Sequence, residues 1–389
     1  MVKIAGREYS VNKIFNVFLD GPRRTPSRTA FHPYEEMLDA RLFALENRSM
    51  TEKFLAFAQG LGLGFLDLFL APSSALYWPY LLGALLIGVP VLVSSAKSPR
   101  LRDWPRLRDW PRLREWPRLL FPREIYFRKS FFADLGMFLF NALLYSLAFL
   151  PYMLSAALVS FYAAELLTKV FGELPIREIG TGERVFFTIA LLLAADFGFF
   201  LAHWLQHRVG FLWEFHKTHH SAPTLNPLTA FRRHPADILL DVNLTALFAG
   251  MVLGTAQYLT GDPEPFLAFL EINAGLFLFR LLGSHLQHSH VWLSYGKFFN
   301  RILISPAMHQ IHHSKAPEHY DRNMGQIFSF WDLLFGSAWI PERREKLELG
   351  LSRNEEKEFR SFFSLYLRPF ARLFRRIASA GKLQGPPPP

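Results

Sequence analysis

Residues 185–220 read VFFTIALLLAADFGFFLAHWLQHRVGFLWEFHKTHH. Up to His207 this stretch is almost entirely apolar, with Asp196 as its one acidic residue. Because a helix of about 20 apolar residues crosses a bilayer, the stretch predicts a membrane-spanning helix. The helix runs directly into closely spaced histidines. The sequence therefore indicates a membrane protein with metal-binding chemistry at one end of its helices.

Working outward, histidine is concentrated in one part of the chain. Of 14 histidines, 13 lie between His203 and His319. They occur as His203 and His207, as His216, His219 and His220, as His285, His288 and His290, and as His309, His312 and His313. Side chains three or four residues apart share one helix face, so each such pair is expected to reach one metal ion. The adjacent His220 and His313 point about 100° away and are expected to serve a second ion.

A structural origin does not explain so many imidazoles at this spacing. Protonated rings would repel one another, and neutral rings are costly to bury without partners. A metal cluster removes both objections. His288 is expected to complete the set, with His285 and His290 as its competitors, whereas His234 and His319 are equally well explained as core residues.

The chain contains no cysteine, which excludes zinc fingers, iron–sulfur clusters and thiol catalysis. All-imidazole ligation suits Fe, Zn, Cu or Ni. A structural zinc ion needs only four ligands, whereas eight or more suggest two ions with positions left open for oxygen. Iron is favoured, because oxidation of unreactive C–H bonds requires O₂ chemistry that zinc does not supply.

Composition supports a membrane location. Half of the 389 residues are hydrophobic, 40 are Phe, and 43 Lys+Arg against 33 Asp+Glu give a net charge of +10. Long apolar runs accompany this basic excess, so juxtamembrane positive charge explains it better than nucleic-acid binding.

The chain divides into five segments. They are a cytosolic N-terminal arm (1–53), an apolar hairpin (54–95), a basic linker (96–130) with RLRDWP repeats from Arg100 and Arg106 and RLREWP from Arg112, the histidine-bearing membrane domain (131–340), and a basic amphipathic C-terminal tail (341–389). Further crossings are expected at 132–167, 185–207, 238–259 and 265–282. Keeping the basic segments inside places every histidine group on the cytosolic face. The predicted fold is all-α: a multi-pass, polytopic membrane helical bundle with a cytosolic-side, histidine-rich metal site.

Longer motifs resemble a known family. They are Asp196 ahead of His203 and His207, LWEFHKTHHS (212–221), AFRRHP (230–235), HSH (288–290), SPAMHQIHHS (305–314), and NMG (323–325) followed by WDLLFG (331–336). In these motifs the chain, over about 131–369, resembles the sterol desaturase / fatty acid hydroxylase superfamily of membrane di-iron oxygenases. Trp204 departs from the Arg that is common there, which changes a flanking contact rather than a ligand. The first 130 residues lie outside the resemblance.

The resemblance implies a fatty acid hydroxylase-like catalytic domain over 131–340, two non-haem Fe ions, O₂ and an external electron-donor protein of reductase, cytochrome or ferredoxin type. The implied metal ligands are His203, His207, His216, His219, His220, His288, His309, His312 and His313. Ligating histidines usually donate their other N–H to a carboxylate or carbonyl. Asp196, two helical turns before His203, is the first candidate for that role in catalysis, followed by Asp332 and Asn323.

The implied function is hydroxylation of a C–H bond of a membrane lipid or sterol-like substrate. A sterol or lipid desaturase and an ether-lipid monooxygenase share the same site and remain alternatives. A divalent-metal transporter is a less favoured alternative, because transport needs ligands near the bilayer midplane, whereas these histidines gather at helix ends. A metal-free, decayed enzyme is opposed by the intact histidine triplets.

Overall fold

The structure is a computed structural model that describes residues 2–4, 7–9, 66–97, 115–145, 152–270 and 272–378. Helices dominate it, as predicted. The α-helices are α4 (Trp78–Lys97), α5 (Trp116–Leu120), α6 (Arg123–Tyr126), α7 (Lys129–Leu144), α8 (Ala156–Phe171), α9 (Thr181–Arg208), α10 (Gly210–His220), α11 (Pro235–Thr260), α12 (Ala274–Leu281), α13 (Gly296–Phe299), α14 (Pro306–His312), α15 (Phe330–Phe335), α16 (Arg353–Glu358) and α17 (Phe362–Ala378). Short 3₁₀ helices are η5 (Pro227–Phe231), η6 (Ser284–Leu286) and η7 (Pro317–His319).

Strands are few and short. β1 (Val2–Ile4) pairs antiparallel with β2 (Arg7–Tyr9), and β3 (Ala268–Phe269) pairs antiparallel with β4 (Ile272–Asn273). These two hairpins form no larger sheet among the described residues.

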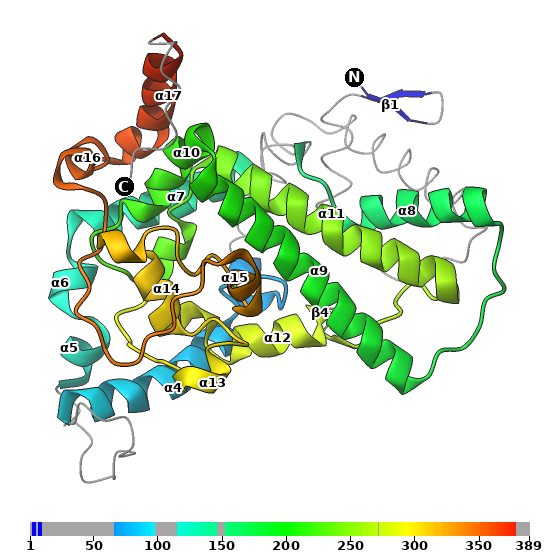
Figure 1. Cartoon of the computed structure of the whole chain (residues 1–389), viewed down its shortest axis with the longest axis horizontal. Coiled ribbons are helices and arrows are strands. Elements are labelled where there is room, and N and C mark those ends of the chain that lie inside the picture. Colours follow the sequence, from blue (N-terminus) through cyan, green and yellow to red (C-terminus); the bar gives the residue numbers. More distant parts are fainter. Residues whose placement is uncertain are drawn as a thin grey trace, which may run out of the picture.

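Two helices form the centre of the bundle. α9 and α11 are each long and apolar enough to cross a membrane, and they pack along each other, with α8 along α11 (Figure 1). Glycine allows the close approach. A Cβ on Gly198 of α9 would lie 2.8 Å from the Thr245 Cα of α11, and a Cβ on Gly254 of α11 would lie 2.8 Å from the Ala163 Cβ of α8. Small residues at helix contacts are typical of membrane bundles.

Two of the expected crossings are wrong. The stretch 132–167 is not one span: it contains α7 and α8, each 16 residues long, or about 24 Å. The stretch 265–282 contains the β3–β4 hairpin and the eight-residue α12, which is too short for the ~30 Å hydrocarbon core. Asn273 explains the late start of α12, because its side chain accepts hydrogen bonds from the backbone N–H groups of Gly275 and Leu276.

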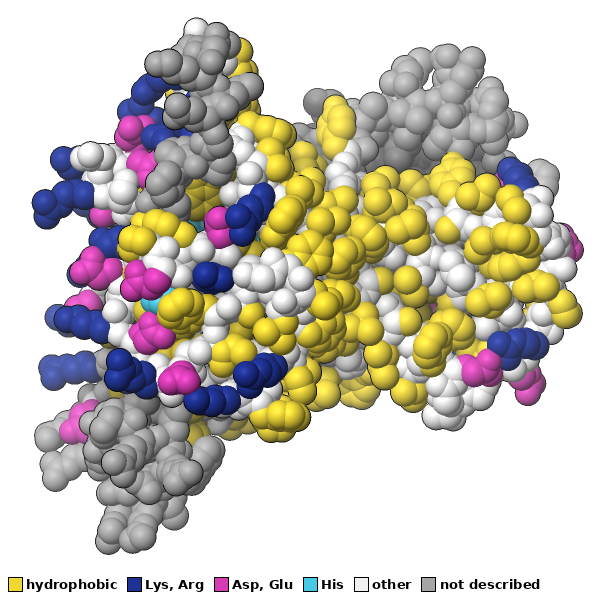
Figure 2. Space-filling model, viewed as in Figure 1, with side chains coloured by type: hydrophobic (Ala, Val, Ile, Leu, Met, Phe, Trp, Pro, Cys, Tyr) yellow, Lys and Arg dark blue, Asp and Glu magenta, His cyan; other side chains and the backbone are white. Residues whose placement is uncertain are grey.

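The surface is divided by side-chain type. A broad hydrophobic surface covers the middle of the molecule, whereas most Lys, Arg, Asp and Glu side chains in view gather at the end that carries the histidines, with fewer at the opposite end (Figure 2). Exposed apolar residues on α8 and α9 include Phe161, Leu166 and Phe186. A hydrophobic exterior of this kind suits a lipid environment.

Several predicted segments lie largely outside the described residues. They are most of the N-terminal arm, the first half of the apolar hairpin and the hexapeptide repeats. In the second half of the hairpin, α4 packs against α12 and η6. The C-terminal tail contributes α16 and α17, and α17 packs on α10.

Candidate metal centre

The nine predicted ligands lie in two compact groups. The first histidine group is His203, His207, His216, His220 and His312, and the second is His219, His288, His309 and His313. Within each group the ligand nitrogens all lie within 4.8 Å of one another. α9, α10 and α14 supply most of the rings, and His288 comes from the loop after η6. Segments far apart in sequence therefore meet in one cluster.

Residues are paired within these groups differently from the sequence prediction. His216 was expected to share an ion with His219, and His309 with His312. Instead, His216 joins His220 in the first group and His309 joins His313 in the second. On a helix, the residues at i+3 and i+4 lie on opposite sides of residue i when the helix is viewed along its axis. The ring at i+3 can therefore belong to the neighbouring histidine group, while the ring at i+4 belongs to the same group as residue i.

In the first histidine group, hydrogen bonds to oxygen atoms outside the group fix the orientation of three rings. The Nδ1 atoms of His203 and His312 lie 2.7 Å from the backbone carbonyls of Met324 and Arg322, respectively. The Nδ1 atom of His216 lies 2.9 Å from Asp237 Oδ1. These oxygens accept, so Nδ1 carries the proton in each ring and Nε2 carries a lone pair.

These lone pairs converge inside the group. Nε2 of His203 and Nε2 of His216 are 3.1 Å apart, although both rings hold their N–H at Nδ1. The buried Nε2 atoms of His207, His220 and His312 have no hydrogen-bond partner among the described residues. Inward lone pairs at this distance repel one another unless a cation lies between them. The donor set of the first group therefore fits a metal ion.

The second histidine group converges on His288. Its Nε2 atom lies 2.9 Å from Nε2 of His309 and 3.2 Å from Nε2 of both His219 and His313. One ring N–H cannot satisfy three such neighbours. The outer Nδ1 atoms of His219, His309 and His313 are buried without a partner among the described residues. This group also fits a cation.

Burial favours the neutral form of six of the nine rings. It lowers the pKa of His309 to about 3, and it lowers the pKa of His219, His220, His288, His312 and His313 well below the usual value, with neighbouring imidazoles adding to the effect. Neutral imidazole is the form that ligates metals. The rings are therefore ready to bind a metal ion near neutral pH.

The predicted supporting residues lie close by without touching the rings. Asp196 accepts from the backbone N–H groups of Ile327 and Phe328 and from Trp331 Nε1. Asp332 accepts from the N–H groups of Met324 and Gly325. No hydrogen bond described for Asp196, Asn323 or Asp332 reaches a histidine. The prediction that these residues orient a ring directly is therefore wrong.

Their common role is to hold one loop. Asn323 has a positive φ of 57°, accepts from the Trp339 N–H and donates to the Met308 carbonyl. Together with Asp196 and Asp332 it fixes residues 323–328, which present the Met324 carbonyl to His203. The three residues therefore contact the backbone of the loop beside His203 rather than a ring.

The carboxylates that do contact rings are Asp237 and Asp321. Asp237 is buried on α11, where it bonds His216 and also pairs with Arg233 at 3.2 Å. Asp321 Oδ1 lies 3.3 Å from Nδ1 of His207. Sequence reasoning missed both. Asp237 follows the AFRRHP motif by two residues, which is the one local signal that pointed to it.

The remaining histidines of the region have other partners. Ring nitrogens of His285 and His290 bond the carbonyls of Ala75 and Leu119. His234 caps α11 through the Ala236 N–H, and His319 pairs with Glu345. None of these four belongs to either group, which resolves the competition with His288.

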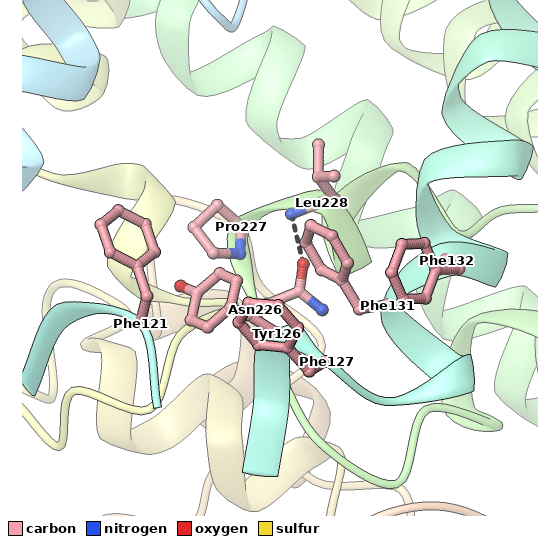
Figure 3. A pocket seen from close by; sticks show the side chains of 8 residues that line it. All are labelled: Phe121, Tyr126, Phe127, Phe131, Phe132, Asn226, Pro227 and Leu228. Carbon is pink, nitrogen blue, oxygen red and sulfur yellow. Dashed lines mark hydrogen bonds between the residues drawn. The ribbon is translucent and has the colours of Figure 1, made fainter. Parts of the chain in front are cut away.

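An apolar pocket lies beside His290, which belongs to neither group. It has a volume of about 540 Å³ and is lined by Phe121, Tyr126, Phe127, Phe131, Phe132, Asn226, Pro227 and Leu228 (Figure 3). The Tyr126 ring packs edge-on against His290, with centroids 6.4 Å apart, two residues from His288. The lining is aromatic and aliphatic, which suits a hydrocarbon group.

Comparison with known proteins agrees with the motifs. Residues 188–337 match the family model for fatty acid hydroxylase. Ornithine lipid hydroxylase OlsE of Rhizobium tropici is 31% identical over 185 residues, covering 48% of this chain and 50% of that protein. Human alkylglycerol monooxygenase is 26% identical over 160 residues, covering 41% and 32%. A very-long-chain aldehyde decarbonylase, GL1-9 of Oryza sativa subsp. indica, is 26% identical over 153 residues, covering 39% and 53%.

The chain thus spans about half or less of the length of these curated relatives. No solved structure matches it. The family match contains all nine predicted ligands and also the NMG and WDLLFG motifs. Over residues 188–337 the chain is thus similar to the fatty acid hydroxylase / sterol desaturase superfamily.

Proposed function

We propose that the chain is an oxidoreductase that uses O₂ and external electrons to hydroxylate a C–H bond of a membrane lipid, with one iron ion in each histidine group. The observation that carries the proposal is the convergence of nine imidazoles, eight of them buried and that of His288 half-buried, with five in one group and four in the other. Iron bound there would supply the O₂ chemistry that amino-acid side chains lack. In the balanced reaction one oxygen atom enters the C–H bond and the other leaves as water, with two electrons from the donor and two protons.

The protein's own contribution is to position the histidine rings and to exclude water from the site. The carbonyls of Met324 and Arg322 and the Asp237 carboxylate hold the first-group rings with Nε2 inward. The burial of both groups keeps bulk water from the reacting atoms. Positioning of this kind favours one bond of a long, uniform chain over its neighbours.

A lipid substrate is supported by two observations. The relatives include a hydroxylase of ornithine lipid and a monooxygenase of alkylglycerol, and the chain itself has two helices able to span a membrane and a hydrophobic exterior. The proposal places the protein in a membrane as a multi-pass protein, with the histidine groups on the cytosolic face and an electron-donor protein docking there. The Lys and Arg side chains that gather at the histidine end of the molecule (Figure 2) support that orientation.

Lipid analysis under ¹⁸O₂ tests the proposal. Cells that express the chain are expected to accumulate a lipid with one labelled oxygen, and cells that express His216→Ala are not. His285→Gln, outside both groups, serves as the matched control and should keep the product. Loss of two hydrogens without label would replace hydroxylation by desaturation, and unchanged lipids with well-folded protein would refute the proposal.

A further inference from the structure

The C-terminal helix α17 is amphipathic, and its apolar face points away from the rest of the protein. Five apolar side chains form one stripe along it, at positions separated by three or four residues, and all point outward. This apolar stripe consists of Phe363 (72% exposed), Leu367 (64%), Phe370 (44%), Phe374 (67%) and Ile377 (59%). A helix on a water-soluble surface normally turns such a stripe toward the core.

The charged face of α17 points inward instead. Arg372 pairs with Glu214 of α10 at 2.6 Å and with Glu355 at 2.9 Å, and Arg376 pairs with Glu214 at 2.7 Å. The Glu214 side chain is completely buried and also pairs with Lys217 at 3.3 Å. Breaking a buried ion pair is costly, so these pairs fix the rotation of α17 about its axis.

Further contacts fix the same orientation. The Thr218 hydroxyl donates to the Leu365 carbonyl at 3.0 Å, and Tyr366 donates its hydroxyl to Asn141 of α7 at 2.8 Å. Leu365 is fully buried between these elements. The helix cannot roll to hide its apolar stripe without losing these bonds. Burial of large apolar side chains is favourable, so we expect another apolar surface to cover the stripe.

We infer that this cover is a lipid surface: α17 is an interfacial helix whose apolar stripe enters the boundary between headgroups and acyl chains. This inference goes beyond the proposed function, because it assigns a membrane-docking surface outside the metal site. An interfacial helix of this type inserts about 5–10 Å deep.

Continuity with the rest of the apolar surface favours lipid. Phe140 of α7 packs edge-on against Phe362 and Tyr366 of α17, with centroids 5.5 and 5.1 Å apart. α7 in turn exposes Phe132, Leu139 and Leu143. In Figure 2 the yellow side chains visible on the projecting α17 lie on the side that faces the yellow belt of the molecule.

Charge favours an anionic lipid surface. α17 carries Arg368, Arg372, Arg375 and Arg376 and no acidic residue. By helical geometry Arg368 lies about 140° around the helix from the centre of the apolar stripe, and its long side chain can extend toward phosphate groups while its stem stays apolar. A basic helix with an aromatic stripe is the pattern of interfacial anchors.

The absence of cysteine from the chain allows a direct test. Leu367→Cys and Phe374→Cys, each labelled with a small fluorophore, probe the apolar stripe of the full chain. Lys357→Cys on the exposed side of α16 is the matched control. Each protein is placed in nanodiscs that hold one chain in phosphatidylcholine and phosphatidylglycerol. Quenching by nitroxide-labelled lipid is compared with quenching by aqueous iodide.

The inference predicts several-fold stronger lipid quenching at positions 367 and 374 than at 357, and weaker iodide quenching. Iodide quenching equal to that at 357 would overturn it. Protection from both quenchers would also overturn it and would indicate another segment of this chain as the cover. Protection that appears only with two chains per disc would indicate a second copy. Metal content of the same variants tells failure of this inference apart from failure of the proposed function.

Discussion

At the scale of single residues, metal binding by the first histidine group depends on keeping the ring proton of His216 on Nδ1. Asp237 bonds Nδ1 of His216, so it fixes the tautomer and increases the basicity of Nε2. We expect Asp237→Asn to lower metal affinity roughly 10- to 100-fold, since it keeps the shape and removes the charge. Competition with a chelator measures this.

Asp241→Asn is the matched control for that variant. Asp241 lies one helical turn further along α11 and contacts Arg233 and Gln206 but no histidine. Chelator curves that are the same for Asp237→Asn and wild type would show that the Asp237 carboxylate does not act on the metal.

Residue identities at the site were predictable to different degrees. The nine histidines follow from spacing and motif, because ligand spacing on a helix is a local property. Asp321 could not be found this way, since its partner His207 is 114 residues away in sequence. Asp196 was misjudged for a physical reason: two helical turns place it about 10.5 Å along α9 from His203, within reach of residues 327–331 rather than of a ring.

At the scale of elements, the contact of α8 with α11 depends on glycine. A Cβ at Gly254 would meet the Ser160 carbonyl oxygen and would lie 2.8 Å from the Ala163 Cβ. Because backbone cannot yield as a side-chain tip can, we expect Gly254→Ala to destabilise the protein by about 1–3 kcal/mol. Thermal unfolding in detergent measures the loss.

Gly182→Ala is the matched control, because a Cβ at this position has free space. Nothing lies within 4 Å of a Cβ at Gly182 in the first turn of α9, so alanine should stabilise by up to about 1 kcal/mol through helix propensity. A Gly254→Ala protein as stable as Gly182→Ala would mean that α8 does not pack closely on α11.

Helices were predictable from hydropathy where nothing interrupts the run, as in α9 and α11. Hydropathy failed where local chemistry breaks a run. Ser155 caps a new helix inside 132–167, where its side chain accepts from the Leu158 N–H, and Asn273 starts a new helix inside 265–282. Apolar composition counted these residues as ordinary members of a span.

At the scale of the whole molecule, the sequence predicted an all-α membrane protein with a metal site, and the helix-rich structure with two candidate spans agrees with its coarser part. The meeting of α9, α10, α14 and the His288 loop was not derivable from spacing, because it depends on long-range packing. The clustering of all nine histidines, with their segments at one end of α9, also disfavours a transport path, which requires ligands along the spans.

The central claim is that the two histidine groups bind one iron ion each. Iron per chain, measured by mass spectrometry on the purified full-length protein, tests it most directly. We predict two iron ions for the wild type and for His285→Gln, and one for the double variant His309→Ala, His313→Ala, which removes half of the second group. No stably bound iron in the folded wild-type protein, or equal iron in the wild type and the double variant, would contradict the claim.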